Sequence, residues 1–152
     1  MAAIWFKERS LEEINAIGRG TMMAHLDMRV TAILPDALEG EMPVTEKNIQ
    51  PAGLLHGGAS VALAETLGSV AANLVVDPAE FGCVGLEINA NHIRAVRLGQ
   101  HVHGVARPLH LGTTTQVWDI RISDEKERLT CIARLTMAVI RLKGKGLNRY
   151  LS

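Results

Sequence analysis

Residues 57–76 form a stretch that is apolar almost throughout and carries one acidic side chain, Glu65. A run of this kind predicts a helix from about Gly58 to Val76 that is covered by other structure and is about 29 Å long at ~1.5 Å per residue. A carboxylate is rarely buried without compensation, because removing its charge from water is costly. We therefore expect Glu65 to serve chemistry or a partner. The alternative is a buried carboxylate satisfied by Ser69 or by a strand amide.

Composition limits the classes of protein that this chain can form. With 152 residues and 47% hydrophobic content it fits one domain, for which we expect residues 1–142 and a C-terminal tail at 143–152. The formal net charge is 0, so no global field attracts nucleic acid or an anionic membrane. Glu65, Ser69 and Asn73 interrupt the apolar run, and the sequence therefore predicts no membrane helix.

The two cysteines, Cys83 and Cys131, stand in apolar surroundings, and no secretory signal precedes them. This pattern is typical of free, buried thiols in a reducing compartment. We expect a cytoplasmic protein.

Local patterns predict the remaining elements. Ser10 and Glu13 form a capping box for a short helix that ends at Gly18 and turns Leu11, Ile14 and Ile17 inward. Strand-like runs separated by turn residues follow on both sides of the long helix. They lie at residues 28–34, 38–44, 84–94, 101–110, 114–123 and 129–142. The predicted fold class is α+β, an antiparallel sheet of about six strands curled around one helix.

A second candidate site is the start of the long helix, where His56, Gly57 and Gly58 follow a loop that contains Gln50. Unpaired amides and the positive end of the helix dipole favour an incoming oxyanion there. Gly57 allows close approach to the backbone, and the Gln50 amide is a further donor. Taken alone the motif is weak, because in most chains it would be an ordinary turn.

No acidic residue lies between Glu87 and Asp119, although basic side chains do. Arginine matches phosphate oxygens, so this basic strip is a candidate site for a nucleotide-bearing carrier; solvated strand positions are the alternative. A metal site at His101 and His103 lacks a third ligand. The members of the strip are His92, Arg94, Arg97, His101, His103, Arg107 and His110.

Other catalytic motifs are missing. Ser60 resembles the serine of a nucleophile elbow, but the second glycine is absent and the serine would lie inside the helix. The sequence contains no P-loop, dinucleotide-binding fingerprint or HExxH motif.

Longer motifs carry a resemblance to a known family. They are Gln50-Pro51, the run from Gly53 to Val61, Leu63-Ala64-Glu65, Gly68 to Ala71, Val84 to Arg94, Pro108 to Gly112 and Gln116-Val117-Trp118. Together they resemble the hotdog-fold acyl-CoA thioesterases of the phenylacetate-pathway type, over nearly all of residues 4–142. Within that family the similarity is greatest to the groups that hydrolyse 1,4-dihydroxy-2-naphthoyl-CoA and that proofread enterobactin synthesis.

The resemblance implies a homotetramer of two hotdog dimers, with active sites between protomers and no metal or redox cofactor. Glu65 would be nucleophile or general base, with Ser69 beside it, while Gln50, His56 and the Gly57 amide of the facing protomer polarise the thioester carbonyl. The coenzyme A arm would lie along two segments. They comprise Asn91, His92, Ile93 and Arg94, and Leu109, His110, Leu111, Gly112, Thr113 and Thr114.

These expectations lead to hydrolysis of acyl-CoA or acyl-carrier-protein thioesters with aromatic acyl groups. Two alternatives remain. One is a hotdog dehydratase acting on hydroxyacyl thioesters, and the other is a non-catalytic acyl-CoA binding module. Thiol release from a saturated aroyl-CoA separates hydrolysis from both.

Overall fold

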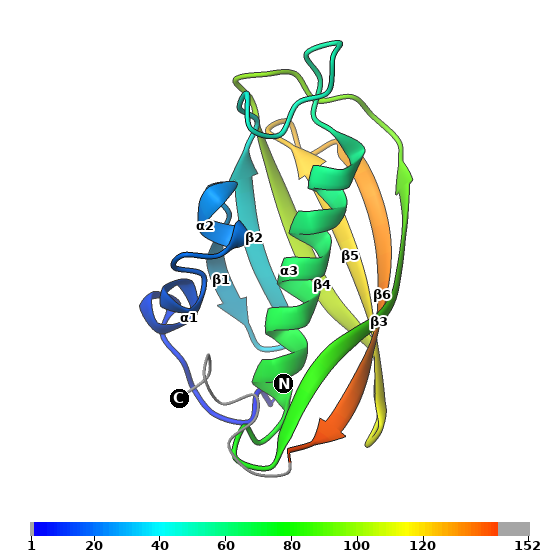
Figure 1. The fold of residues 1–152 in the computed structure, drawn as a ribbon. Coiled ribbons are helices and arrows are strands. Elements are labelled where there is room, and N and C mark those ends of the chain that lie inside the picture. The colour runs from blue at the N-terminus through cyan, green and yellow to red at the C-terminus, as the bar shows by residue number, and fades with distance from the viewer. Residues whose placement is uncertain (1, 143–152) are drawn as a thin grey trace.

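The chain forms one antiparallel sheet with a long helix packed on its concave face (Figure 1). The structure, a computed structural model, describes residues 2–142; the predicted tail at 143–152 lies outside them. The sheet order is β1-β2-β4-β5-β6-β3. The strands are β1 (Arg29–Leu34), β2 (Ala37–Pro43), β3 (Phe81–His92), β4 (His101–Leu111), β5 (Thr115–Asp124) and β6 (Leu129–Arg141). This arrangement confirms the predicted α+β hotdog fold.

Helix α3 (Gly57–Val75) forms the core with the inner face of the sheet. Leu63 and Leu67 are fully buried, opposite Trp118, Ile120 and Leu135 of the sheet. Close approach depends on glycine in the strands. A Cβ on Gly104 would lie 2.7 Å from a methyl carbon of Leu67, and one on Gly40 would lie 2.5 Å from the other.

Length and composition do not decide the prediction that α3 is not a membrane helix, because the core helix of a soluble protein can have the same length and composition. The sequence of α3 is long and apolar enough to cross a bilayer, and 44% of an 18-residue apolar stretch within it is buried in the protein. The buried part is the side that faces the sheet. The other side, which includes Glu65, Thr66 and Val70, is partly exposed, so the residues that the structure describes do not provide the expected complete cover of the helix.

The N-terminal segment packs beside α3. The capping box of α1 (Leu11–Ile17) is confirmed by hydrogen bonds in both directions between Ser10 and Glu13. Ile14 is buried as predicted, but Leu11 is 38% exposed, so its inward orientation was wrong. The short helix α2 (Met22–His25) had not been predicted; Thr21 caps it.

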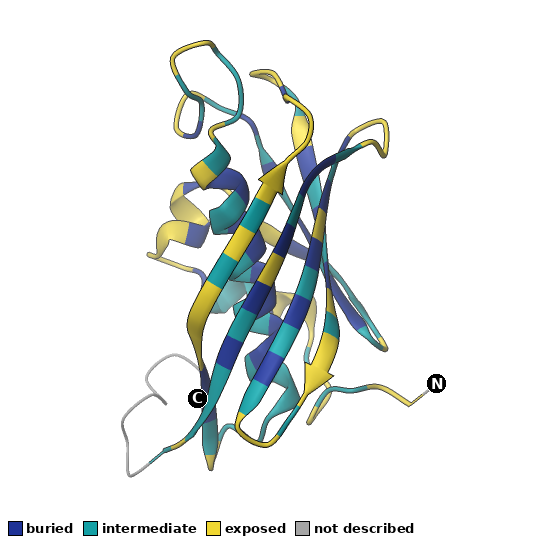
Figure 2. Cartoon of the chain, turned by 90° about the vertical axis from the view of Figure 1, so that its right-hand side faces the viewer, coloured by how far each residue is buried: buried dark blue, intermediate teal, exposed yellow. Residues whose placement is uncertain are grey.

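Strand β3 is an open edge of the sheet. Val84 and Leu86 are exposed on it, and a bulge interrupts its pairing with β6 between Gly85 and Glu87. Figure 2 shows exposure along most of this strand. An exposed edge that carries apolar side chains is a template for pairing with another strand.

Candidate active site

The start of α3 leaves hydrogen-bond donors available. His56 is the N-cap, and its Nδ1 accepts a hydrogen bond from the Gly58 N–H at 2.8 Å. The neutral ring therefore carries its proton on Nε2, which remains a donor. The Gly57 N–H, at the first position of the helix, donates to no acceptor within residues 2–142. Two donors at the positive end of a helix dipole suit an oxyanion.

His92, from the end of β3, lies against this helix start. A Cβ on Gly57 would be 2.8 Å from His92 Nε2, so a side chain at position 57 would collide with the imidazole. The loop before the helix holds Gln50, whose side-chain oxygen accepts a hydrogen bond from the Ala52 N–H. That contact leaves the Gln50 amide nitrogen as the donor. The three donors expected near the thioester carbonyl thus lie at one end of the molecule. They are the Gln50 amide, the His56 Nε2–H and the Gly57 N–H.

An open groove of about 370 Å³ is lined by Gln50 and Gly57, whereas His56 is not among its lining residues. This volume lies in the range of small-molecule sites. Five of the residues expected at the active site line the groove, namely Gln50, Gly57, His92, Ile93 and Arg94. The remaining lining residues, which sequence reasoning missed, are Leu54, Leu55, Ser60, Ala95, Val96 and Thr130. Most of them are close in sequence to those five, but Thr130 comes from β6, where its carbonyl accepts a hydrogen bond from the Ile93 N–H.

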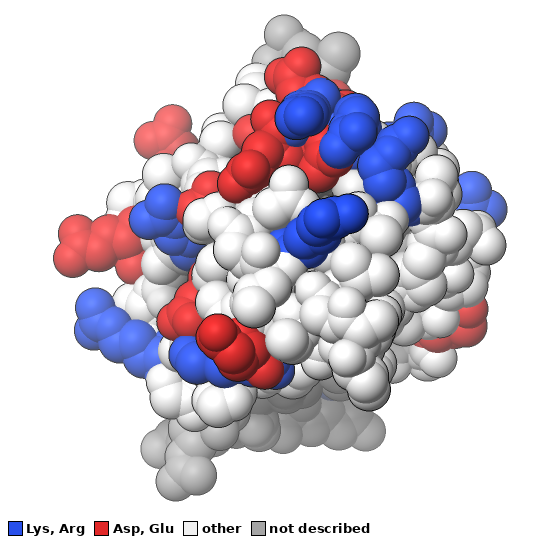
Figure 3. Space-filling model, turned by 90° about the horizontal axis from the view of Figure 1, so that it is seen from above, with Lys and Arg blue, Asp and Glu red and all other residues white. Residues whose placement is uncertain are grey.

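The predicted basic strip is not a continuous positive surface. Arg107 pairs with Asp36 at 2.8 Å, and the His101 and His103 rings lie 3.3 and 3.4 Å from Glu125 and Glu39. At the helix-start end of the molecule, acidic and basic side chains lie next to each other (Figure 3). For these members the alternative of solvated strand positions is correct. Arg94 stays at the groove, where its Nη1 donates to the Leu129 carbonyl at 2.9 Å.

The environment of Glu65 differs from the expected one, in which other structure covers the helix and Ser69 lies beside the carboxylate. Glu65 is partly exposed, and in the described part of the chain its carboxylate has no hydrogen-bond or ion-pair partner. The Ser69 hydroxyl lies 3.9 Å from the sulfur of Met137 and makes no hydrogen bond to Glu65. Glu65 Oε1 instead approaches Gly85, where a Cβ would be only 3.1 Å away. The carboxylate is therefore free to accept a proton or attack an electrophile.

The candidate residues fall into separate groups within one chain. Positions 57 and 65 are about 12 Å apart along the helix axis at ~1.5 Å rise per residue. The Gly57 end meets His92, whereas Glu65 meets Gly85 near the middle of β3. Leu109, His110, Leu111, Gly112, Thr113 and Thr114 lie at the other end of the sheet from Asn91–Arg94, since β4 and β5 join there. A pocket of about 250 Å³ beside Gly112 and Thr113 marks that end.

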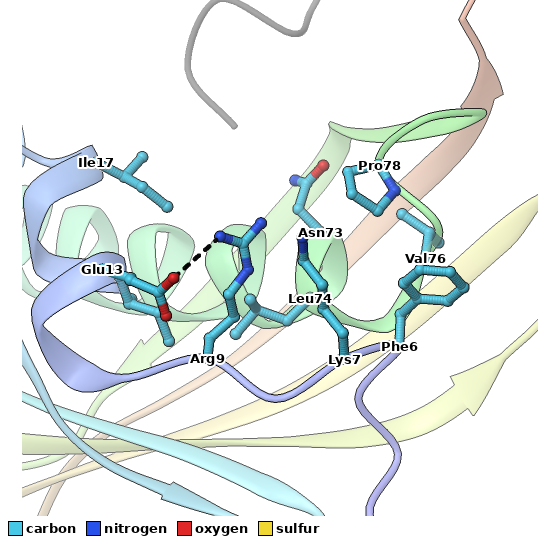
Figure 4. A pocket seen from close by; sticks show the side chains of 10 residues that line it. Phe6, Lys7, Arg9, Glu13, Ile17, Asn73, Leu74, Val76 and Pro78 are labelled. Carbon is cyan, nitrogen blue, oxygen red and sulfur yellow. Dashed lines mark ion pairs between the residues drawn. The ribbon is translucent and has the colours of Figure 1, made fainter. Parts of the chain in front are cut away.

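A further pocket lies between the N-terminal segment and the C-terminal end of α3. Phe6, Lys7 and Pro78 help to line it, and an ion pair at 3.7 Å joins Arg9 to Glu13 at its side (Figure 4). Its volume of about 30 Å³ has room for little more than water. It contains none of the residues expected for catalysis.

Neither cysteine is suited to act as a nucleophile. Burial raises the pKa of the Cys83 thiol to about 11 and raises the pKa of the Cys131 thiol as well. Both therefore stay protonated near neutral pH. Within residues 2–142, no three His, Cys, Asp or Glu side chains are grouped so that they could hold a metal ion.

Comparison with known proteins agrees with this geometry. The model of the thioesterase superfamily matches residues 52–131, which include the helix start, Glu65 and Gly85. The chain belongs to this family. As a thioesterase it is a thioester hydrolase, and the predicted family is confirmed.

Two relatives of this thioesterase carry specific names. The 1,4-dihydroxy-2-naphthoyl-CoA hydrolase of Escherichia coli is 54% identical over 137 residues, which span 90% of this chain and 99% of the relative. A proofreading thioesterase of Cronobacter sakazakii is 50% identical over 137 residues, covering 90% and 98%. Among solved structures, a glutamine-to-alanine variant of a Pseudomonas aeruginosa thioesterase is 48% identical, with a TM-score of 0.90, over 92% of this chain and 100% of that one.

Proposed function

We propose that the protein hydrolyses acyl-CoA thioesters with aromatic acyl groups, and that each active site uses two protomers. One observation carries the proposal. The Glu65 carboxylate and the Gly57 N–H, neither of which has a hydrogen-bond partner among residues 2–142, stand on the same helix. They are too far apart for one thioester carbonyl to meet both within a single chain. Both contact the open-edge strand β3, through Gly85 and His92.

Pairing of two β3 strands across a two-fold axis would join the separated groups. In an antiparallel pair, the His92 end of one β3 lies beside the Phe81 end of the other. The segment Leu109–Thr114 of the partner subunit would then approach Asn91–Arg94. The exposed Val84 and Leu86 would be covered at the same time, and so would the partly exposed side of α3. Two such dimers form the proposed homotetramer.

The proposed reaction divides into two tasks. The Gln50 amide, the His56 Nε2–H and the Gly57 N–H of one protomer donate to the thioester oxygen, where negative charge develops. Glu65 of the other protomer either takes a proton from the attacking water or attacks the carbonyl carbon itself. The carbon–sulfur bond then breaks, and the electron pair leaves with the sulfur as the thiolate of coenzyme A. If Glu65 has attacked the carbon itself, water then cleaves the resulting anhydride, which releases the free acid and restores the carboxylate. Arg94, at the rim of the groove, holds the carrier's phosphates.

The aromatic acyl group is supported by the Escherichia coli relative, whose name specifies a naphthoyl thioester. The test is a panel of benzoyl-, naphthoyl- and straight-chain acyl-CoA thioesters, with the released thiol measured by a chromogenic reagent. We expect the largest kcat/KM for the aroyl thioesters. A benzoyl thioester offers no hydroxyl group to eliminate, so thiol release from it also separates hydrolysis from dehydration. Binding of benzoyl-CoA without thiol release would overturn the proposal.

A further inference from the structure

Gly85 faces the catalytic helix from the edge strand. In the sheet it is paired with Met137, which is 1% exposed and points into the core, so position 85 also faces inward. A Cβ built there would lie 3.1 Å from Glu65 Oε1. This spacing is tighter than most real Cβ contacts, so a side chain at position 85 would require the carboxylate to shift by a few tenths of an ångström.

The β3 backbone is irregular at this point. Its pairing with β6 shifts between Gly85 and Glu87, so Leu86 is the extra residue of a bulge and is 63% exposed. A bulge bends a strand locally and changes the direction of the adjacent residues. The bend and the missing side chain coincide at the position that the Glu65 carboxylate contacts.

Gly104 provides a contrast. Its missing Cβ also faces α3, but it would meet a Leu67 methyl carbon at 2.7 Å, inside the apolar core. Glycine at position 104 allows the helix to pack on the sheet. Glycine at position 85 instead leaves space for the Glu65 carboxylate, which has no hydrogen-bond partner among residues 2–142.

We infer that Gly85 is a positioning residue for Glu65: the absence of a side chain at the bulge of β3 leaves the space that the carboxylate occupies, with both of its oxygens free for the reaction. The inference rests on the proposed function, because it assigns the orientation of Glu65 to hydrolysis. No hydrogen bond holds the carboxylate in the described residues, so nothing of that kind would oppose its displacement by a methyl group at position 85.

The first test compares Gly85→Ala with the matched control Gly104→Ala. For Gly85→Ala we expect kcat for benzoyl-CoA to fall about tenfold, because small misplacements of a catalytic group are costly, with KM changed by less than about threefold. For Gly104→Ala we expect a lower midpoint of thermal unfolding, and a kcat per folded molecule within about threefold of the wild type. Circular dichroism supplies the folded fraction of each variant.

A double-mutant cycle shows that the effect acts through Glu65. Glu65→Asp withdraws the carboxylate by one methylene, which leaves space for the new methyl group. In single-turnover measurements on the Glu65→Asp enzyme, adding Gly85→Ala should therefore change the rate by less than about threefold. A purely structural role would give the same loss in both backgrounds.

Several results would overturn the inference. They are a Gly85→Ala enzyme with wild-type kcat, an equal loss in the Glu65→Asp background, and a Gly85→Ala chain that does not fold. If the wild type hydrolyses thioesters and Glu65→Gln does not, an unaffected Gly85→Ala enzyme overturns this inference alone. A wild type that is inactive on every thioester overturns the proposed function and this inference with it.

Discussion

The two halves of α3 differ in whether their polar groups have hydrogen-bond partners in the described part of the chain. In the C-terminal half, Asn73 donates to the Ser69 and Cys83 carbonyls and accepts from the Cys83 N–H at 2.9 Å. Beneath it, the buried Gln116 accepts from the Trp118 indole at 2.9 Å and donates to the Ala72 carbonyl. In the N-terminal half, the Gly57 N–H and the Glu65 carboxylate have no such partner among residues 2–142.

The difference separates structural from functional polarity. A buried polar group that is fully satisfied fixes a helix on its sheet, and Asn73 does so by binding the backbone of β3. A polar group left without a partner beside a groove or an open edge is available to a ligand. Sequence composition does not distinguish the two, because Asn73 and Glu65 interrupt the same apolar run.

The largest effect is expected from Glu65→Gln. The change keeps the side-chain volume and removes the charge that activates water or attacks carbon, so kcat should fall by ~10³-fold or more. Thiol release measures the rate, and circular dichroism confirms the fold. If the folded variant keeps a kcat within about tenfold of the wild type, Glu65 belongs with the structural groups and the mechanism is wrong.

Gln50→Ala should rank second. Losing one donor to a developing oxyanion typically lowers kcat by ~10²- to 10³-fold, or roughly 3 to 4 kcal/mol. The free energy of unfolding should hardly change, since the only hydrogen bond of the Gln50 side chain in the described residues is the one it accepts from the Ala52 N–H of its own loop. Steady-state kinetics with benzoyl-CoA give the comparison. An effect confined to KM would place Gln50 in ground-state binding.

Gln116→Ala tests the structural half. The residue is 1% exposed, and its loss leaves the Trp118 indole N–H without its acceptor. The free energy of unfolding should fall by about 2 to 3 kcal/mol, from the unsatisfied donor and the cavity together. Urea unfolding measures this change. In the folded fraction, kcat should stay within about threefold of the wild type, and a loss comparable to that of Gln50→Ala would erase the distinction between the two halves of α3.

Local chemistry explains which features the sequence could predict. The capping box at Ser10, the helix start at Gly57 and the strand runs depend on neighbours in the chain, and the structure has them. Helix α2 was missed because a single turn capped by Thr21 leaves too short a periodic signal.

Contacts between distant segments explain the rest. The acidic partners of the basic strip are Asp36, Glu39 and Glu125, which no spacing within the strip reveals. Strand register decides these pairs, and likewise brings Gly85 to Glu65 and places Leu109–Thr114 away from Arg94. The sequence predicted a site around Glu65 and Gly57, and the family resemblance implied that the two act from different protomers. The physical reason, about 12 Å of helix between the two positions at ~1.5 Å per residue, is seen only once both are placed on α3.

The smallest effect is expected from Arg94→Ala. Its guanidinium binds the Leu129 carbonyl at the rim of the groove and is otherwise exposed. If it also holds carrier phosphates, KM for acyl-CoA should rise roughly 5- to 10-fold with kcat nearly unchanged, because such contacts are equal in ground and transition states. Arg107→Ala is the matched control, since Arg107 pairs with Asp36 instead of facing the groove. The difference in KM between the two variants should shrink as ionic strength rises. Equal KM values for both would place Arg94 outside the site, among the solvated members of the basic strip.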